Sequence, residues 1–273
     1  MSMSCPKLVV EIANNHKDII ASKKLRYKVF VEEMGVDING LTDMLEEDYY
    51  DDRCYHLLVK DTKTGEVVAS TRILSDTQAS QAGSYYSENE FDLTGLLPLP
   101  GKVLEIGRTC VHAGYRKGSA ISILWSGLSR FMIIHKIDYL IGCASIPMLD
   151  GGINANTIIQ KLRMSYFTNP DRRVIPRTPL PANMEYGERI VLPPLLKAYL
   201  RLGAKVCGEL SVDPDFNVAD LFILLDMDDL HPRYQSHFLE RIESRRTDSE
   251  LYPLASTSQN SIETAYEGER VGI

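Results

Sequence analysis

Apolar residues recur along the chain with two periods, and each period predicts one kind of element. Alternating or continuous apolar runs predict strands at 7–13, 103–111 and 138–146, a hairpin over 54–74, and a strand pair at 204–213 and 218–227. Helical spacing predicts helices at 18–35, 119–136, 155–167 and 192–203. This order of elements predicts a mixed sheet with helices on both faces.

No internal repeat or linker divides the chain before its last stretch. Residues 39–53 and 169–181 show no clear period and are expected to form loops. Residues 75–101 are expected to wrap around the surface, with a short helix near 87–93. A short helix is expected within 228–242. We expect one domain over residues 1–244, followed by a disordered tail over 245–273, because the tail is polar and aperiodic.

Composition narrows the functional classes. The net charge of −7 argues against nucleic-acid binding, because a nucleic-acid-binding protein is expected to carry a large basic surface. The five cysteines are widely spaced and form no C-x-x-C pair, which favours reduced, buried thiols over disulfides or a metal site. No signal peptide and no apolar run of about 20 residues is present, so we expect a cytoplasmic protein that is at most peripheral to the inner membrane.

The segment 103–121 combines a strand with unexpected charges. Glu105 and Arg108 lie three residues apart, so a regular strand would point them to opposite faces. Gly107 lies between them, and glycine inside a strand often marks a bulge that shifts the register by one. A bulge here would bring both charges to one side and free backbone groups for an extended ligand. The alternative is a structural ion pair between Glu105 and Arg108.

The turn that follows this strand has the features of a phosphate site. Glycine lets the backbone come close, Arg116 and Lys117 supply positive charge, and the amides at the start of helix 119–136 point outward. The alternative is that both basic residues are merely solvated.

Strand, turn and helix together resemble the acyl-carrier site of the GNAT acyltransferases. In that family the turn has Arg or Gln, two residues, Gly, one residue, then Gly or Ala. Tyr115 stands at the first place here, and a single phosphopantetheine phosphate suits this turn better than the pyrophosphate of coenzyme A. The matching positions are Tyr115, Arg116, Lys117, Gly118, Ser119 and Ala120.

Further stretches resemble acyl-homoserine-lactone synthases and, more closely, their hemolysin-like relatives, the ornithine N-acyltransferases. They are LRYKVFVEEMG with Arg26 and Phe30, EEDYYDDRCYHLLV with Asp48 and Asp51, STRIL with Arg72, LEIGRTCVH with Glu105 and Arg108, and the segment with Asp215 and Asp220. The resemblance spans residues 8–240. It implies an α+β fold, a GNAT-like three-layer α/β/α arrangement whose mixed, mostly antiparallel sheet is splayed around the strand at 102–112.

The resemblance also implies a reaction. A fatty acyl group, 3-hydroxylated in this family, would pass from the phosphopantetheine of acyl carrier protein, or from acyl-CoA, to the α-amine of ornithine, as the first step of ornithine-lipid synthesis. No permanently bound cofactor, metal or covalent acyl-enzyme is expected. Glu105 would be the base, with Arg108 beside it, and the bulged backbone would stabilise the oxyanion. Acceptor contacts are assigned to Arg26, Phe30, Asp48, Asp51 and Arg72.

Two rival functions stay open. One is acylation of another amino acid, as in a glycine-lipid or acyl-homoserine-lactone-type synthase. The other is a non-catalytic, GNAT-shaped protein that binds lipid or carrier. Arg26 has the further alternative of pairing with Glu33 or the loop, and Glu209 is either an acceptor contact or structural. Four arginines form a candidate dock for an acidic carrier protein: Arg163, Arg172, Arg173 and Arg177.

Overall fold

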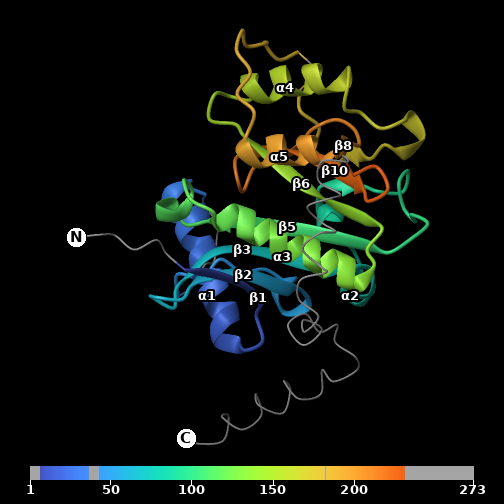
Figure 1. The fold of residues 1–273 in the computed structure, drawn as a ribbon. Coiled ribbons are helices and arrows are strands. Elements are labelled where there is room, and N and C mark those ends of the chain that lie inside the picture. Colours follow the sequence, from blue (N-terminus) through green and yellow to red (C-terminus); the bar gives the residue numbers. More distant parts are fainter. Residues whose placement is uncertain (1–6, 37–42, 182, 231–273) are drawn as a thin grey trace, which may run out of the picture.

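The computed structural model describes residues 7–36, 43–181 and 183–230, and an eight-stranded sheet forms its centre (Figure 1). Its long path runs β1-β2-β3-β5-β6-β10-β8, with β9 beside β10. Only β5 and β6 pair in parallel, so the sheet is mixed and mostly antiparallel, as predicted. The strands are β1 Leu8–Ile12, β2 Tyr55–Asp61, β3 Val67–Ser75, β5 Val103–Val111, β6 Tyr139–Pro147, β8 Lys205–Val206, β9 Ser211–Asp213 and β10 Val218–Asp226.

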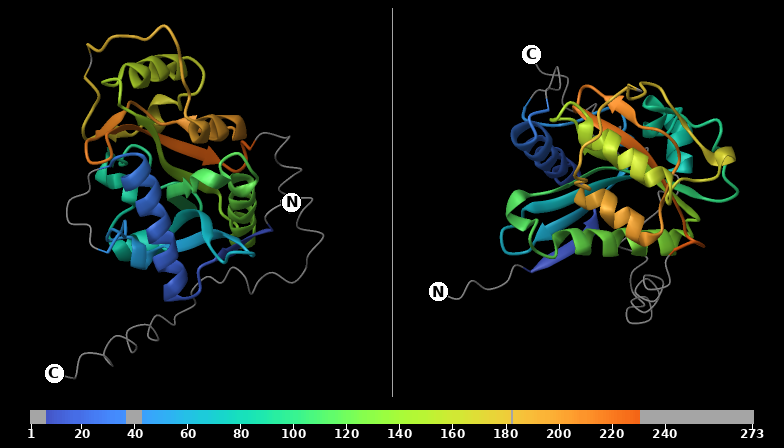
Figure 2. Two further views of the ribbon diagram at one scale, coloured as in Figure 1. Left: turned by 90° about the vertical axis from the view of Figure 1, so that its left-hand side faces the viewer. Right: turned by 90° about the horizontal axis from the view of Figure 1, so that it is seen from above.

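Helices cover both faces of the sheet (Figure 2). Helices α3 (Ala120–His135), α4 (Ile153–Arg163) and α5 (Pro194–Leu202) share one apolar core with the inward residues of the strands. Helices α1 (His16–Arg26) and α2 (Asp76–Ala82) pack on the opposite face. Three layers result, as the sequence pattern predicts. Of the helices in the described ranges, none is sufficiently long and apolar to traverse a bilayer.

Several elements differ from the sequence prediction. Helix α2 was not expected; Ser75 and Gln78 form a capping box that starts it. The helix expected over 18–35 continues beyond α1 as a π-helical stretch, Tyr27–Glu33. The short helix expected near 87–93 is a 3-10 turn, Tyr86–Asn89, followed by β4 (Phe91–Asp92), which pairs with β7 (Ile175–Pro176).

The strand expected over 204–213 is reduced to the short β8 and β9, separated by residues 207–210. The tail predicted for 245–273 and most of the helix predicted within 228–242 lie outside the described residues.

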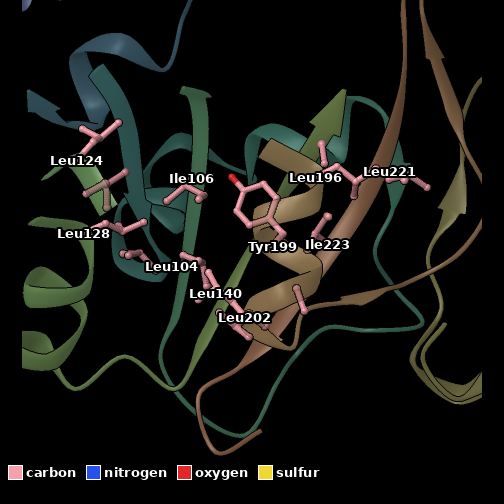
Figure 3. Packing of buried hydrophobic residues seen from close by; sticks show 14 of the residues in the cluster. Leu104, Ile106, Leu124, Leu128, Leu140, Leu196, Tyr199, Leu202, Leu221 and Ile223 are labelled. Carbon is pink, nitrogen blue, oxygen red and sulfur yellow. The ribbon is translucent and has the colours of Figure 1, made fainter. Parts of the chain in front are cut away.

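The sheet splays between β5 and β6. The two strands pair at only three positions, ending at Glu105 and Ile141. At the fork, a Cβ on Gly142 would lie 2.4 Å from the Ile106 carbonyl oxygen, so a side chain there would push the strands apart. Beyond it, Tyr199 projects from α5 against Ile106 and Ile223 (Figure 3), and these residues line a small apolar pocket at the splay. The predicted splay around β5 is therefore present.

Candidate active site

A bulge interrupts β5 beside the fork, as predicted. Ser70 pairs with Cys110, but Arg72 pairs with Gly107, so β5 holds one extra residue between these pairs. The left-handed residue is Arg108, with φ of 51°, and not the glycine. A Cβ on Gly107 would meet nothing within 4 Å, so neither crowding nor strain requires glycine at that position.

The bulge places Glu105 and Arg108 on one side of the sheet, where both contact Tyr86. The Tyr86 backbone N–H donates to Glu105 Oε2 at 2.7 Å, and Arg108 Nη1 donates to the Tyr86 hydroxyl at 2.9 Å. The Ser87 N–H donates to Glu105 Oε1 at 2.9 Å. Glu105 and Arg108 do not pair with each other; a polar loop holds each. The predicted shared side is therefore confirmed.

Glu105 is a buried acid at the end of the β5/β6 ladder. The residue is 3% exposed and lines a small pocket together with Arg72 and Tyr86. Burial raises the pKa of the Glu105 carboxyl, while the hydrogen bonds from Ser87 and Tyr86 oppose that rise. A carboxyl with a raised pKa beside a pocket is the type of group that accepts a proton near neutral pH.

Three arginines and three carboxylates form a closed ring of alternating charges next to Glu105. All three carboxylates, Glu46, Asp48 and Asp51, come from the loop before β2, and they link the arginine of α1 to the arginines of β3 and β5. The bridges are Arg26–Asp51 at 2.5 Å, Arg72–Asp51 at 3.5 Å, Arg72–Asp48 at 2.5 Å, Arg108–Asp48 at 3.2 Å, Arg108–Glu46 at 2.9 Å and Arg26–Glu46 at 2.5 Å. We call these six residues the charge ring.

Burial divides the charge ring into a deep side and an outer side. The side chains of Arg26 and Asp51 are 0% exposed and that of Glu46 is 1% exposed. Asp48 is 23% exposed and Arg108 is 12% exposed, so these two form the outer side. The sequence left open whether Arg26 contacts the acceptor or pairs with Glu33 or the loop; the structure pairs it with the loop, whereas Glu33 pairs with Arg116. The sequence did not single out Glu46.

The remaining predicted acceptor residue, Phe30, lies in the π-helical stretch and packs edge-on against Phe216, with ring centroids 5.8 Å apart. The Arg108 guanidinium lies over the Phe216 ring, 4.6 Å from its centroid. Phe216 therefore contacts the Arg108 guanidinium directly, and Phe30 packs behind Phe216.

The arginines keep Asp48 and Asp51 ionised. Burial would raise the pKa of Asp51, but two hydrogen bonds and the charge of Arg26 hold it well below the ordinary value. Burial likewise opposes the charge of Asp48, and Arg72 still lowers its pKa. His56 Nε2 donates to the Asp51 carbonyl oxygen, 2.9 Å away, and burial lowers the pKa of His56 to about 4, which keeps the imidazole neutral.

The neutral state of His56 predicts a specific pH dependence of stability. The unfolded chain takes up the His56 proton below about pH 6.5, but the folded protein does not until about pH 4. Stability from this residue is therefore complete above 6.5 and is lost as the pH falls from 6.5 to 4. Between pH 7 and pH 5 we expect a loss of about 2 kcal/mol in wild type that His56→Asn lacks.

Urea unfolding at both pH values measures this difference, and His16→Asn, at an exposed position of α1, is the control. An identical pH slope in wild type and His56→Asn would show that His56 is not responsible.

The basic turn lies at the other end of β5 and is largely exposed. The Tyr115 hydroxyl donates to Asp61 at 2.8 Å, and Arg116 contacts Glu33 and the Val111 carbonyl. Lys117 is exposed. The turn then leads through Gly118 and Ser119 into α3, which begins at Ala120. The predicted phosphate-binding residues therefore lie together at the start of a helix. Two of them already bind carboxylates: Tyr115 binds Asp61 and Arg116 binds Glu33.

Other candidates from the sequence lie away from the charge ring. Glu209 pairs with Arg163 at 2.5 Å on the surface, so it is a structural contact in this structure. The four arginines of the predicted dock are exposed, and three of them also contact neighbouring protein groups. The described cysteines, Cys54, Cys110, Cys143 and Cys207, are free, as predicted. Burial raises the pKa of each thiol, which disfavours a nucleophilic thiolate.

Known proteins resemble this chain in sequence and in fold. A family model described as an acetyltransferase (GNAT) domain matches residues 25–126. The AHL synthase LasI and the coenzyme-A-dependent acyl-homoserine lactone synthase BjaI share the fold, each with a TM-score of 0.51. LasI is 17% identical, and the alignment covers 86% of this chain and 96% of LasI. BjaI is 16% identical, and the alignment covers 88% of this chain and 90% of BjaI.

Curated relatives are more similar in sequence. The L-ornithine N(alpha)-acyltransferase of Rhodobacter capsulatus is 34% identical over 254 residues, which cover 86% of this chain and 96% of the relative. The enzyme of the same name from Brucella abortus is 32% identical over 254 residues, covering 85% and 88%. A bulged, splayed acyltransferase sheet and relatives matched over nearly their whole length lead to one conclusion: the chain belongs to the L-ornithine N(alpha)-acyltransferase family of GNAT-fold acyltransferases.

Proposed function

We propose that this protein transfers a fatty acyl group from a phosphopantetheine thioester to the α-amine of ornithine. The observation that carries the proposal is the position of Glu105, a buried carboxyl with a raised pKa at the fork of the sheet, beside Arg72 and Tyr86. The relatives named L-ornithine N(alpha)-acyltransferase support the choice of acceptor.

Glu105 acts as the general base in this proposal. The ammonium of the acceptor gives one proton to Glu105, directly or through a water. The free amine attacks the thioester carbonyl carbon, and the C–S bond breaks as the tetrahedral intermediate collapses. The attacking nitrogen loses its second proton, which the thiolate takes up, so the products are an amide and a free thiol, and Glu105 releases the first proton to solvent. Backbone groups of β5 beyond the fork lack pairing with β6 and serve as candidate donors to the oxyanion.

The outer members of the charge ring receive the amino acid. Arg108 is the cation best placed for its carboxylate, because it is partly exposed and its orientation is fixed by Glu46 and the Tyr86 hydroxyl. Asp48 is the partly exposed acid beside it. Arg26, Asp51 and Arg72 are fully or nearly buried and act as positioning residues, with Phe30 behind Phe216.

The turn 115–120 binds the donor phosphate in this proposal. Arg116 and Tyr115 already contact acids, so Lys117 and the amides at the start of α3 remain for a phosphate. One modest positive site suits the single phosphate of a carrier-bound phosphopantetheine. The exposed arginines Arg163, Arg172, Arg173 and Arg177 are the candidate surface for an acidic carrier protein.

A single assay tests the donor and the acceptor together. The purified protein is given a 3-hydroxyacyl chain on acyl carrier protein or on coenzyme A, with ornithine, glycine or homoserine derivatives as acceptors, and mass spectrometry identifies the products. We expect an α-N-acyl ornithine, formed faster from the carrier protein. A product from glycine or a homoserine derivative alone would replace ornithine as the substrate, and no product from any acceptor would favour a binding protein.

A further inference from the structure

A second group of acids lies near Glu105 and is not part of the charge ring. Glu90 precedes β4, Asp220 belongs to β10 and Asp213 to β9. One carboxylate oxygen from each lies within 4.8 Å of the other two. We call these three residues the carboxylate cluster.

Two oxygens of the carboxylate cluster lack a hydrogen-bond donor. Asp220 is 3% exposed, and its Oδ1 atom is buried without a partner among the described residues; the same holds for Glu90 Oε2. A buried carboxylate oxygen without a donor costs free energy in proportion to its desolvation. Burial raises the pKa of both acids, and the negative charge of Asp220 raises the pKa of Glu90 further, whereas the hydrogen bond from Glu90 lowers the pKa of Asp220. The pair therefore needs a proton or another positive group.

The positive groups nearby are already engaged. Arg108 acts electrostatically on Glu90 and Asp220, but its guanidinium donates to Glu46, Asp48 and the Tyr86 hydroxyl. The side-chain hydrogen bonds of Asp220 are with Glu90 and Ser145, neither of which carries a positive charge. The described part of the chain thus offers the cluster no cation of its own that donates to it.

The carboxylate cluster lies on the same face of the sheet as Glu105. Glu105 pairs with Ile141, and Cys143 and Ser145 follow at alternate positions of β6, so they point to that face. Ser145 pairs with Asp220. Cys143 is half-buried and Ser145 is exposed, so the face opens to solvent beyond Glu105. A molecule bound at Glu105 can extend along β6 to Asp220.

We propose that Glu90 and Asp220 bind the side-chain ammonium of ornithine and thereby select a diamino acid over neutral amino acids. This inference rests on the proposed function and assigns a residue pair to the far end of the acceptor. The ammonium brings three N–H donors and one positive charge to two oxygens that lack donors. Where the pair holds a proton, that proton leaves to solvent as the ammonium enters.

Acceptors of matched length test this proposal. L-Norvaline has the carbon chain of ornithine without the side-chain amine, and 5-hydroxynorvaline keeps a donor without the charge. We expect wild type to prefer ornithine over norvaline by about 10- to 100-fold in kcat/KM, as for a charge-assisted hydrogen bond. Asp220→Asn and Glu90→Gln should each remove about 10-fold or more for ornithine and leave norvaline turnover unchanged. The control is Asp215→Asn, the same substitution at an exposed aspartate.

Each other outcome overturns the inference in a recognisable way. Equal wild-type turnover of ornithine and norvaline refutes the role of the pair and leaves the proposed function intact. No ornithine turnover by wild type refutes both. An equal loss of both acceptors in the variants indicates a structural role. Loss of wild-type activity in EDTA, restored by a divalent ion, would assign the cluster to a metal. If Asp220→Asn does not fold, Glu90→Gln and the wild-type comparison of ornithine with norvaline still test the proposal.

Discussion

Glu105→Gln is expected to lower kcat for acyl transfer by roughly 100- to 10,000-fold, the range associated with loss of a general base. The amide cannot take the ammonium proton, although it is nearly the same size and keeps one acceptor oxygen. Because Tyr86 and Ser87 both donate to the carboxylate, one backbone N–H also loses its acceptor. KM for the donor should change little, since Glu105 does not lie at the turn that we assign to the phosphate.

The pH profile separates catalysis from folding. The wild-type rate should rise with pH as Glu105 deprotonates, at a pH above the ordinary value of 4.5, because burial raises its pKa. Glu105→Gln should lack this rising limb. Circular dichroism and thermal unfolding monitor the fold, and Glu66→Gln, at an exposed position, is the control. A folded variant with the wild-type kcat would remove Glu105 from the mechanism.

Arg26→Met is expected to lower the free energy of unfolding by about 3–5 kcal/mol, the cost of breaking a buried ion pair from one side. Arg26 is fully buried, and it neutralises Asp51 through two hydrogen bonds of 2.5 and 2.7 Å as well as Glu46. Methionine fills part of the volume but leaves both acids with less positive charge. Urea denaturation measures the loss.

A second substitution and a surface control test the cause. Asp51→Asn in the Arg26→Met background removes the buried negative charge that has lost its Arg26 partner. We expect this second substitution to recover part of the stability. Arg163→Met breaks the exposed pair with Glu209 and should cost no more than about 1 kcal/mol. Equal effects of Arg26→Met and Arg163→Met would show that the charge ring does not contribute through buried pairing.

The elements of the fold could be predicted from the sequence where a hydrophobic period extends over many residues. Strands β1, β2, β3, β5, β6 and β10 and helices α3 and α5 lie close to their predicted ranges, because each has one or two apolar faces that must be buried. Helix α2, DTQASQA, has few apolar residues, and its start depends on the capping box of Ser75 and Gln78. Its short, polar sequence resembled a loop.

The candidate site was only partly accessible from the sequence. Arg26, Asp48, Asp51 and Arg72 were correctly grouped, but their mutual pairing depends on distances that no local pattern encodes. Glu46 and Glu47 are adjacent in an aperiodic loop, yet the first side chain is 1% exposed and the second 50%. Glu90 and Asp220 likewise approach each other only because β4 and β10 meet in the fold. Tertiary structure, not spacing, decides which acid of such a loop is buried.

The splay between β5 and β6 creates an edge in the middle of a sheet. Past Glu105 and Ile141 the two central strands no longer pair, so peptide groups face a gap of the kind that usually occurs at a sheet border and invites another strand. Here α5 covers the gap, with Tyr199 against Ile106 and Ile223. The helix thus covers peptide groups that would otherwise resemble an exposed sheet edge, and under the proposed function a substrate that enters the fork must compete with that cover.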